Sequence, residues 1–283
     1  LHHVPSENDP FVAARKKLWQ RVLQLGALAR LRAIMARPGD KTVAPVFSAE
    51  EGIIFAKDLA LACGVPPSDI DAVIQIDSGQ PFRLNLLEIL CRHCGDPDTG
   101  LCDSLCAGVR TGVREPLPAS GVWRSQSVGE VVRDFQVHSE NWKSAVDDPA
   151  ATSALLAKEI AAGYMVRVPG GLAEARQRWG SFVACGKLGI VSAPGKEPRL
   201  IGDSSVSGAN AAARICERAE NPSVQSLTAA FALSGRTPED VWPFSLDVKG
   251  AHKLVRLHPE EWGLNLFETP LGLLAYTVCH FGA

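Results

Sequence analysis

The sequence lacks any long apolar run, which excludes a membrane-spanning helix. Such a helix needs about 20 consecutive apolar residues, whereas the nearest candidate, residues 22–35, is interrupted by Arg30 and Arg32. A secretory signal is lacking too, because residues 1–10 are polar and lead directly into the cations at residues 15–17. We therefore expect an intracellular protein, cytoplasmic or nuclear, which is not secreted and has no membrane partner.

The chain also has almost no net charge, −2 at pH 7. Taken alone this disfavours a nucleic-acid partner, because phosphate binding needs a basic face. The average hides blocks of one sign: residues 11–37 hold seven Lys or Arg and no acid, whereas residues 40–103 hold eleven acids and four bases. Residues 167–199 hold six Lys or Arg and two Glu. A nucleic-acid backbone would bind along the basic blocks, although a solvated helix face is an equal alternative for the first.

Eight cysteines are expected to stay reduced, because disulfides are rare inside cells. Four of them cluster with the spacing Cys91-x2-Cys94-x7-Cys102-x3-Cys106. Four thiolates suit the tetrahedral coordination of zinc, but only the first pair has the spacing of a zinc knuckle. We therefore favour ordinary packed cysteines over a zinc site.

The sequence contains no internal repeat or low-complexity tract, and 46% of its residues are hydrophobic, enough for one large core or two modest ones. Apolar residues at helical spacing predict helices in residues 13–36, 50–63, 82–93, 153–162 and 172–179. Pro, Ser and Gly become frequent in residues 114–126, which indicates a linker. We expect a mainly helical region of unknown role in residues 1–115, a linker or extended segment in 116–150, and an α/β domain in 151–283.

A basic β-hairpin is predicted within the last of these parts. Two apolar runs, residues 188–193 and 199–201, flank the turn sequence Pro-Gly-Lys-Glu. Lys196 and Arg199 lie on this hairpin, where they could hold a polyanion such as a triphosphate. An ion pair between Arg199 and a neighbouring acid is an equal alternative.

An acid at the end of an apolar strand gives the clearest chemical signal. The apolar run of residues 243–248 contains Asp247, and Gly250 then predicts a turn. A carboxylate placed in this way is a common ligand for a hard cation such as Mg²⁺, although an isolated Asp here is more often a turn cap. Further strands are predicted in residues 255–258, 264–267 and 273–278.

Three segments together resemble the fingers and palm of retroelement reverse transcriptases. Residues 244–252, Phe-Ser-Leu-Asp-Val-Lys-Gly-Ala-His, are similar to the family's apolar-Asp-apolar-x-x-Ala-aromatic motif. Residues 276–282 are similar to its Pro-Phe-Gly-like element. Residues 196–203, with Asn210 beyond them, are similar to its fingers motif. The three follow the family's order, and the resemblance covers residues 153–283.

The resemblance implies an α/β (α+β) chain in which a helical N-terminal region precedes part of a right-hand polymerase, with fingers and an antiparallel palm sheet. It implies RNA-directed DNA polymerase activity, a nucleotidyl transfer that uses two Mg²⁺ ions, deoxynucleoside triphosphates and an RNA or DNA template-primer. Asp247 would be a catalytic carboxylate and metal ligand, and Val248 would offer a backbone carbonyl to the metal. The nucleotide-binding residues would be Lys196, Arg199, His252, Phe281 and Gly282.

The sequence also departs from this family. The family's Tyr-x-Asp-Asp element, with the second metal-binding carboxylate, would lie beyond Ala283. We therefore expect a fragment of a retrotransposon-type polyprotein that is inactive by itself and lacks its downstream domains. His252 replaces a Tyr or Phe, which leaves sugar discrimination open, and His280 replaces a Pro. The alternative function is a non-catalytic nucleic-acid-binding or structural remnant of a retroelement.

Overall fold

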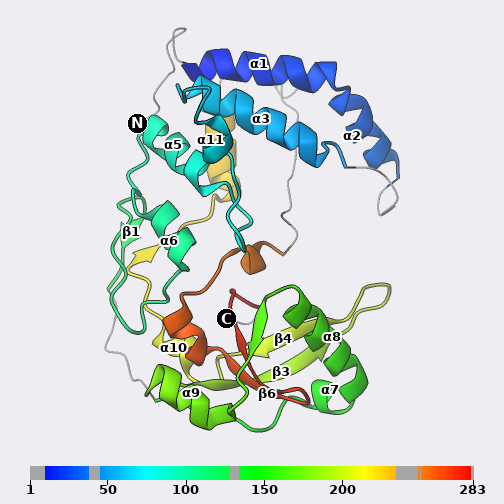
Figure 1. The fold of residues 1–283 in the computed structure, drawn as a ribbon, viewed down its shortest axis with the longest axis vertical. Coiled ribbons are helices and arrows are strands. Elements are labelled where there is room, and N and C mark those ends of the chain that lie inside the picture. The colour runs from blue at the N-terminus through cyan, green and yellow to red at the C-terminus, as the bar shows by residue number, and fades with distance from the viewer. Residues whose placement is uncertain (1–9, 38–44, 128–133, 234–247, 249, 282–283) are drawn as a thin grey trace. The chain divides into compact units, whose positions relative to one another are not determined.

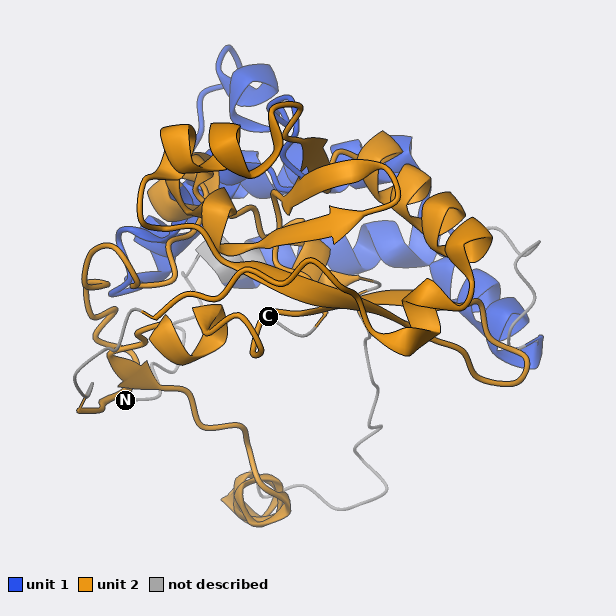
Figure 2. Ribbon diagram, turned by 90° about the horizontal axis from the view of Figure 1, so that it is seen from below, with its two compact units in different colours: residues 1–102 blue, residues 103–283 orange. Residues whose placement is uncertain are grey.

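The computed structural model describes residues 10–37, 45–127, 134–233, 248 and 250–281. The chain divides into two compact units, Leu1–Cys102 and Asp103–Ala283, which Figure 2 draws in blue and orange. In the described residues both helix and sheet are present, as the sequence predicts, and no helix there is long and apolar enough to cross a membrane.

The first unit is helical. Its helices are α1 (Pro10–Gln24), α2 (Ala27–Ala36), α3 (Ala49–Ala62), α4 (Ile70–Val73) and α5 (Leu84–Cys94), and α6 (Leu101–Ala107) begins at its end (Figure 1). The helices predicted in residues 50–63 and 82–93 are confirmed as α3 and α5. The single helix predicted in residues 13–36 is wrong, because Gly26 adopts a left-handed conformation (φ 66°) that ends α1 and begins α2.

Ion pairs neutralise part of the basic block of residues 11–37. Lys17 Nζ and Arg21 Nε of α1 lie 2.8 and 2.6 Å from the carboxylate of Asp58 on α3. Burial raises the pKa of Asp58, but hydrogen bonds from these two cations outweigh burial, and the net pKa lies below its usual range. Arg30 of α2 is bound to Glu51 at 2.8 Å. These three cations therefore hold the helices together and are not available as a phosphate-binding row.

The second unit is built on a five-stranded sheet in the order β2-β7-β6-β3-β4. The strands are β2 (Met165–Arg167), β3 (Cys185–Val191), β4 (Arg199–Asp203), β6 (Leu266–Thr269) and β7 (Gly272–Tyr276). The predicted hairpin is confirmed as β3–β4, and two later predicted strands as β6 and β7. The expected antiparallel sheet is corrected at one place, since β3 and β6 pair in parallel. Because β4 runs antiparallel to β3, it returns the chain to the end of the sheet where both β3 and β6 begin.

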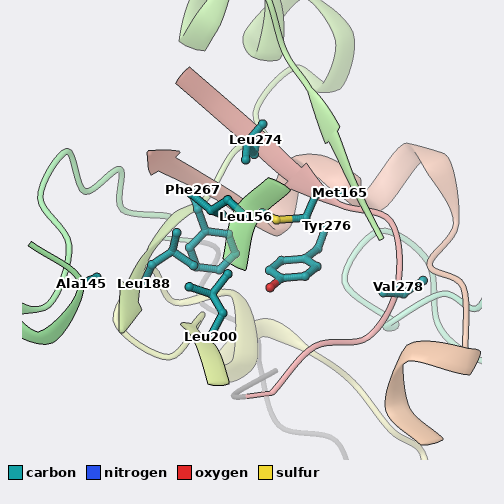
Figure 3. Close-up of a cluster of buried hydrophobic side chains, with 9 residues drawn as sticks. All are labelled: Ala145, Leu156, Met165, Leu188, Leu200, Phe267, Leu274, Tyr276 and Val278. Carbon is teal, nitrogen blue, oxygen red and sulfur yellow. The ribbon is translucent and has the colours of Figure 1, made fainter. Parts of the chain in front are cut away.

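Both faces of this sheet are covered by helices. They are α7 (Lys143–Val146), α8 (Pro149–Ala161) and α9 (Gly171–Trp179), which confirms the helices predicted in residues 153–162 and 172–179. Along β7, Leu274 and Tyr276 enter the cluster that contains Leu156 of α8 (Figure 3), whereas Leu273 and Ala275 enter the cluster of α9. A strand buried on both faces explains the uninterrupted apolar run at residues 273–278.

The second unit has further elements outside this sheet. They are α10 (Ala209–Ala212), α11 (Val224–Leu233), the 3-10 helices η2 (Ala251–Leu254) and η3 (Pro259–Leu264), and a small sheet of β1 (Arg124–Ser125) with β5 (Glu217–Arg218). The strand predicted in residues 255–258 is absent from the described residues, where isolated bridges join Arg256 to Val278 and Leu257 to Val109.

The boundary between the units differs from the one expected at residue 115, because the segment after Gly108 packs into the second unit. Val109 N donates to Arg256 O at 2.7 Å, and Thr111 donates through N and Oγ1 to the buried carboxylate of Glu261 at 2.7 and 2.8 Å. Within the stretch 116–150, expected as a linker or extended segment, described residues also make contacts with the sheet, such as the 2.8 Å bond from Trp142 N to Leu188 O.

Candidate nucleotide-binding site

The β3–β4 hairpin carries two of the predicted site residues. Lys196 lies in its turn, where Lys196 N donates to Ala193 O at 3.0 Å. Arg199 begins β4 opposite Val191 and is exposed, whereas the next residue, Leu200, is buried. Because successive strand residues point to opposite faces, the Arg199 side chain points away from the core. It has no ion-pair partner among the residues that the structure describes, and its guanidinium is therefore available to an anion.

The C-terminal segment lies against β4. Gly202 N donates to Phe281 O at 3.0 Å. A Cβ atom at Gly202 would lie 2.7 Å from the ring of Phe267 and 2.9 Å from the ring of His280, so only glycine fits here. This close approach fixes the backbone of Phe281 beside the strand that carries Arg199.

The rings of His252 and Phe281 meet, with centroids 4.5 Å apart and planes inclined by 66°. Backbone hydrogen bonds bring their segments together: Cys279 N donates to Val255 O at 3.0 Å, and Leu257 N to Thr277 O at 2.8 Å. Phe281 remains 47% exposed. Two residues predicted from separate sequence motifs therefore form one partly open aromatic pair.

His252 presents an unpaired nitrogen in this pair. Its Nε2 atom is buried and has no hydrogen-bond partner in the described part of the chain. Burial and the charge of Lys253 lower the pKa of His252, against the opposing effect of Glu159. The ring is therefore neutral near pH 7. A buried polar atom without a partner costs free energy.

Lys253 has a structural role that its sequence position does not indicate. The sequence favours a solvated or phosphate-facing lysine, but Lys253 Nζ is bound to Glu159 of α8 and lies 5.2 Å from the ring centroid of Tyr164. The ammonium group therefore ties η2, and with it His252, to the second unit's core.

His280 is a buried polar residue that sequence reasoning noted only as a departure from the family. It is 4% exposed, and its Nε2 lies 3.2 Å from Ser204 Oγ and 3.1 Å from the side-chain amide of Asn265. Its Nδ1 lies 3.1 Å from Phe281 O, the carbonyl that β4 also binds. His280 therefore helps to position Phe281. The adjacent apolar run was the only sequence signal that indicated burial.

The two proposed metal ligands are Asp247 and Val248, and only Val248 is described. Asp247 lies outside the described residues, as does Gly282, which was proposed to bind the nucleotide. Val248 is 57% exposed, and its carbonyl oxygen accepts one hydrogen bond from Ala251 N at 3.2 Å, which leaves a second lone pair for a hard cation. The described ranges contain no group of three or more His, Cys, Asp or Glu side chains that could hold a metal ion.

The four clustered cysteines have different environments. Cys102 is buried and Cys91 half-buried, whereas Cys94 and Cys106 are exposed. Burial raises the pKa of Cys91, and Asp96 raises it further. A raised pKa disfavours the free thiolate, and the choice between packed cysteines, which we favour, and a zinc site stays a prediction.

A further cavity lies elsewhere on the second unit. It has a volume of about 720 Å³ and contains none of the predicted site residues; its lining includes Asn141, Lys143, Thr152, Glu268 and Thr269. The candidate nucleotide site is therefore a surface formed by the hairpin and the His252–Phe281 pair, and it is distinct from this cavity.

Comparisons with protein-family models, with curated proteins and with solved structures find no match to this chain. The functional assignment depends on the residues and their geometry alone.

Proposed function

We propose that residues 153–283 form the fingers and part of the palm of an RNA-directed DNA polymerase from a retroelement. In the complete protein this domain would transfer deoxynucleotides to a primer on an RNA or DNA template. The observation that supports the proposal is the convergence of three predicted motifs. The hairpin strand with Arg199 binds the backbone of Phe281, and the ring of Phe281 contacts His252.

Each residue has a role in this proposal that matches its chemistry. Arg199 and Lys196 would bind the triphosphate, since guanidinium and ammonium groups form charge-assisted hydrogen bonds to phosphate oxygens. The His252–Phe281 pair, with Gly282, would line the nucleotide pocket. Asp247 and the Val248 carbonyl would hold Mg²⁺, which when bound neutralises the charge of the phosphates.

Primer extension by the full-length protein tests the proposal. We expect Mg²⁺-dependent extension that Asp247→Asn abolishes. Asp71→Asn is the matched control, because its side chain is 84% exposed and the first unit carries it. Extension by Asp247→Asn at the wild-type rate would refute the role of this acid. Salt-sensitive nucleic-acid binding without any extension would favour the non-catalytic alternative.

A further inference from the structure

The small β1–β5 sheet places two arginines directly opposite each other. Its register pairs Arg124 with Arg218 and Ser125 with Glu217. Both arginines are exposed. Directly opposed residues of antiparallel strands have Cβ atoms about 5 Å apart, and like charges in such a pair repel. The two guanidinium groups therefore form a local concentration of positive charge.

The neighbouring acid does not neutralise this pair. The carboxylate of Glu217 accepts hydrogen bonds from Ser120 N and Ser120 Oγ, both at 2.8 Å, and from Gly121 N at 3.0 Å. Hydrogen bonds from the backbone and side chain of Ser120 lower the pKa of Glu217. Because strand side chains alternate, Glu217 lies on the opposite face from Arg218. Neither arginine has an ion pair within the described ranges.

The backbone around the arginines is held rigidly. Gln126 N donates to Cys216 O at 2.8 Å, and its side chain donates to Ile215 O at 2.7 Å. Arg214 N donates to Thr111 O at 2.8 Å. The strands that carry the two guanidinium groups are thus fixed before any ligand binds, which reduces the entropy cost of binding.

Two exposed apolar residues precede the first arginine in the chain. Trp123 precedes Arg124 and is 47% exposed, and Val122 is 50% exposed. A nucleobase stacks on an exposed aromatic ring irrespective of its identity, and Arg or Lys beside the ring binds the phosphate backbone. The combination of an arginine pair with one exposed tryptophan fits a single nucleic-acid strand.

We propose that Arg124 and Arg218 bind the phosphodiester backbone of a single-stranded nucleic acid, with Trp123 stacking on a base. The site rests on the proposed function, to which it adds a contact for the template or primer strand outside the nucleotide pocket. The ligand is defined by its phosphodiester chemistry, which RNA and DNA share.

Fluorescence anisotropy on the full chain tests the site. The probes are labelled RNA and DNA single strands of one sequence, titrated between about 50 and 200 mM salt. Arg124→Gln/Arg218→Gln should weaken binding by about tenfold and reduce the slope of log K against log [salt] by about 0.7 for one shared phosphate or about 1.4 for two. Trp123→Ala should weaken binding by roughly fivefold or more without changing the slope.

Two matched variants control for charge and folding. Lys57→Gln/Arg92→Gln removes two positive charges from exposed ion pairs outside the basic blocks and should leave the salt slope unchanged. Arg124→Lys/Arg218→Lys keeps the charge and should recover most of the slope. Loss of slope in the Gln variant with recovery in the Lys variant supports the site, since a folding defect would not follow charge.

Other results overturn the site. Binding by Arg124→Gln/Arg218→Gln with the control variant's affinity and slope would do so. The site would also be refuted if the Arg124→Gln/Arg218→Gln variant bound oligonucleotides as the wild type does but lost binding to phosphatidylglycerol vesicles. That result would indicate that the two arginines bind a lipid surface. These results are separate from the polymerase test. If primer extension depends on Asp247 but the Arg124→Gln/Arg218→Gln variant binds nucleic acid normally, only the strand-binding site is refuted. The opposite result is loss of nucleic-acid binding in the Arg124→Gln/Arg218→Gln variant when the wild-type protein shows no primer extension. It would support the strand-binding site and refute only the polymerase proposal.

Discussion

The imidazole of His280 is stacked on the ring of Tyr276, with centroids 4.5 Å apart and planes inclined by 25°. The ring of Phe267 meets the same imidazole edge-on at 5.4 Å. This aromatic enclosure, together with the hydrogen bonds to Ser204 and Asn265, holds an ionisable residue in the core beside the candidate nucleotide site. Burial lowers the pKa of His280 to about 4.

The lowered pKa of His280 predicts acid sensitivity. An unfolded histidine has a pKa near 6.5, so between about pH 6.5 and 4 the unfolded chain binds a proton that the folded chain does not. Stability contributed by neutral His280 is therefore complete above pH 6.5 and is lost as the pH falls toward 4. We expect a loss of about 2 kcal/mol between pH 7 and pH 5.

Urea unfolding at several pH values measures this effect. His280→Gln should be less stable at pH 7 but should show a flatter pH dependence than the wild type. His93→Gln, which changes an exposed histidine, should keep the wild-type pH dependence. If His280→Gln retains the full pH dependence, another group causes it and the burial of His280 is not responsible.

Two strand glycines of the β3–β4 hairpin, Gly202 and Gly189, predict different effects of an added methyl group. A Cβ at Gly202 would lie 2.7 Å from Phe267 and 2.9 Å from His280, whereas a Cβ at Gly189 would meet its nearest atom, Ser144 Oγ, at 3.4 Å. Gly202→Ala should therefore destabilise the protein by about 2 kcal/mol through overpacking. Gly189→Ala should be neutral or stabilising by about 0.5 kcal/mol, because alanine loses less backbone entropy.

Chemical denaturation of the two variants gives the comparison, and the two positions serve as controls for each other because both are strand glycines of one hairpin. Equal free energies of unfolding for Gly202→Ala and Gly189→Ala would contradict the close approach of the C-terminal segment to β4. The predicted order would support the geometry that places the backbone of Phe281 against Gly202 of β4.

Elements set by local sequence could be predicted. The turn sequence between β3 and β4 has the composition of a hairpin, and α3 begins at Ser48, whose side chain forms a capping box with Glu51. The break at Gly26 was missed because apolar residues continue at helical spacing through it, while a single left-handed residue ends the hydrogen-bond ladder. The spacing of apolar residues reports which side chains are buried, and it does not reveal a change in the backbone conformation of one residue.

Features set by distant partners could not be predicted. The segment after Gly108 belongs to the second unit because of two contacts with residues about 150 positions away along the chain. Val109 binds the carbonyl of Arg256, and Thr111 binds the carboxylate of Glu261 in η3. The burial of His280 depends likewise on Ser204 and Asn265, which lie on other elements. Of the candidate site, the basic hairpin and the residues His252 and Phe281 could be named from the sequence, while the bond from Gly202 N to Phe281 O and the contact of Phe281 with His252 required the fold.

The exposed guanidinium of Arg199 predicts a test of the nucleotide site that needs no catalysis. Charge-assisted hydrogen bonds contribute about 1.5–3 kcal/mol, so Arg199→Gln should raise the Kd of the chain for deoxythymidine triphosphate with Mg²⁺ by about tenfold or more. Lys187→Gln on the same hairpin is the control, because Lys187 lies over the ring of Trp142, with 5.0 Å from its Nζ to the centroid. Isothermal titration should give the control a wild-type Kd. A wild-type Kd for Arg199→Gln would instead remove Arg199 from the triphosphate site.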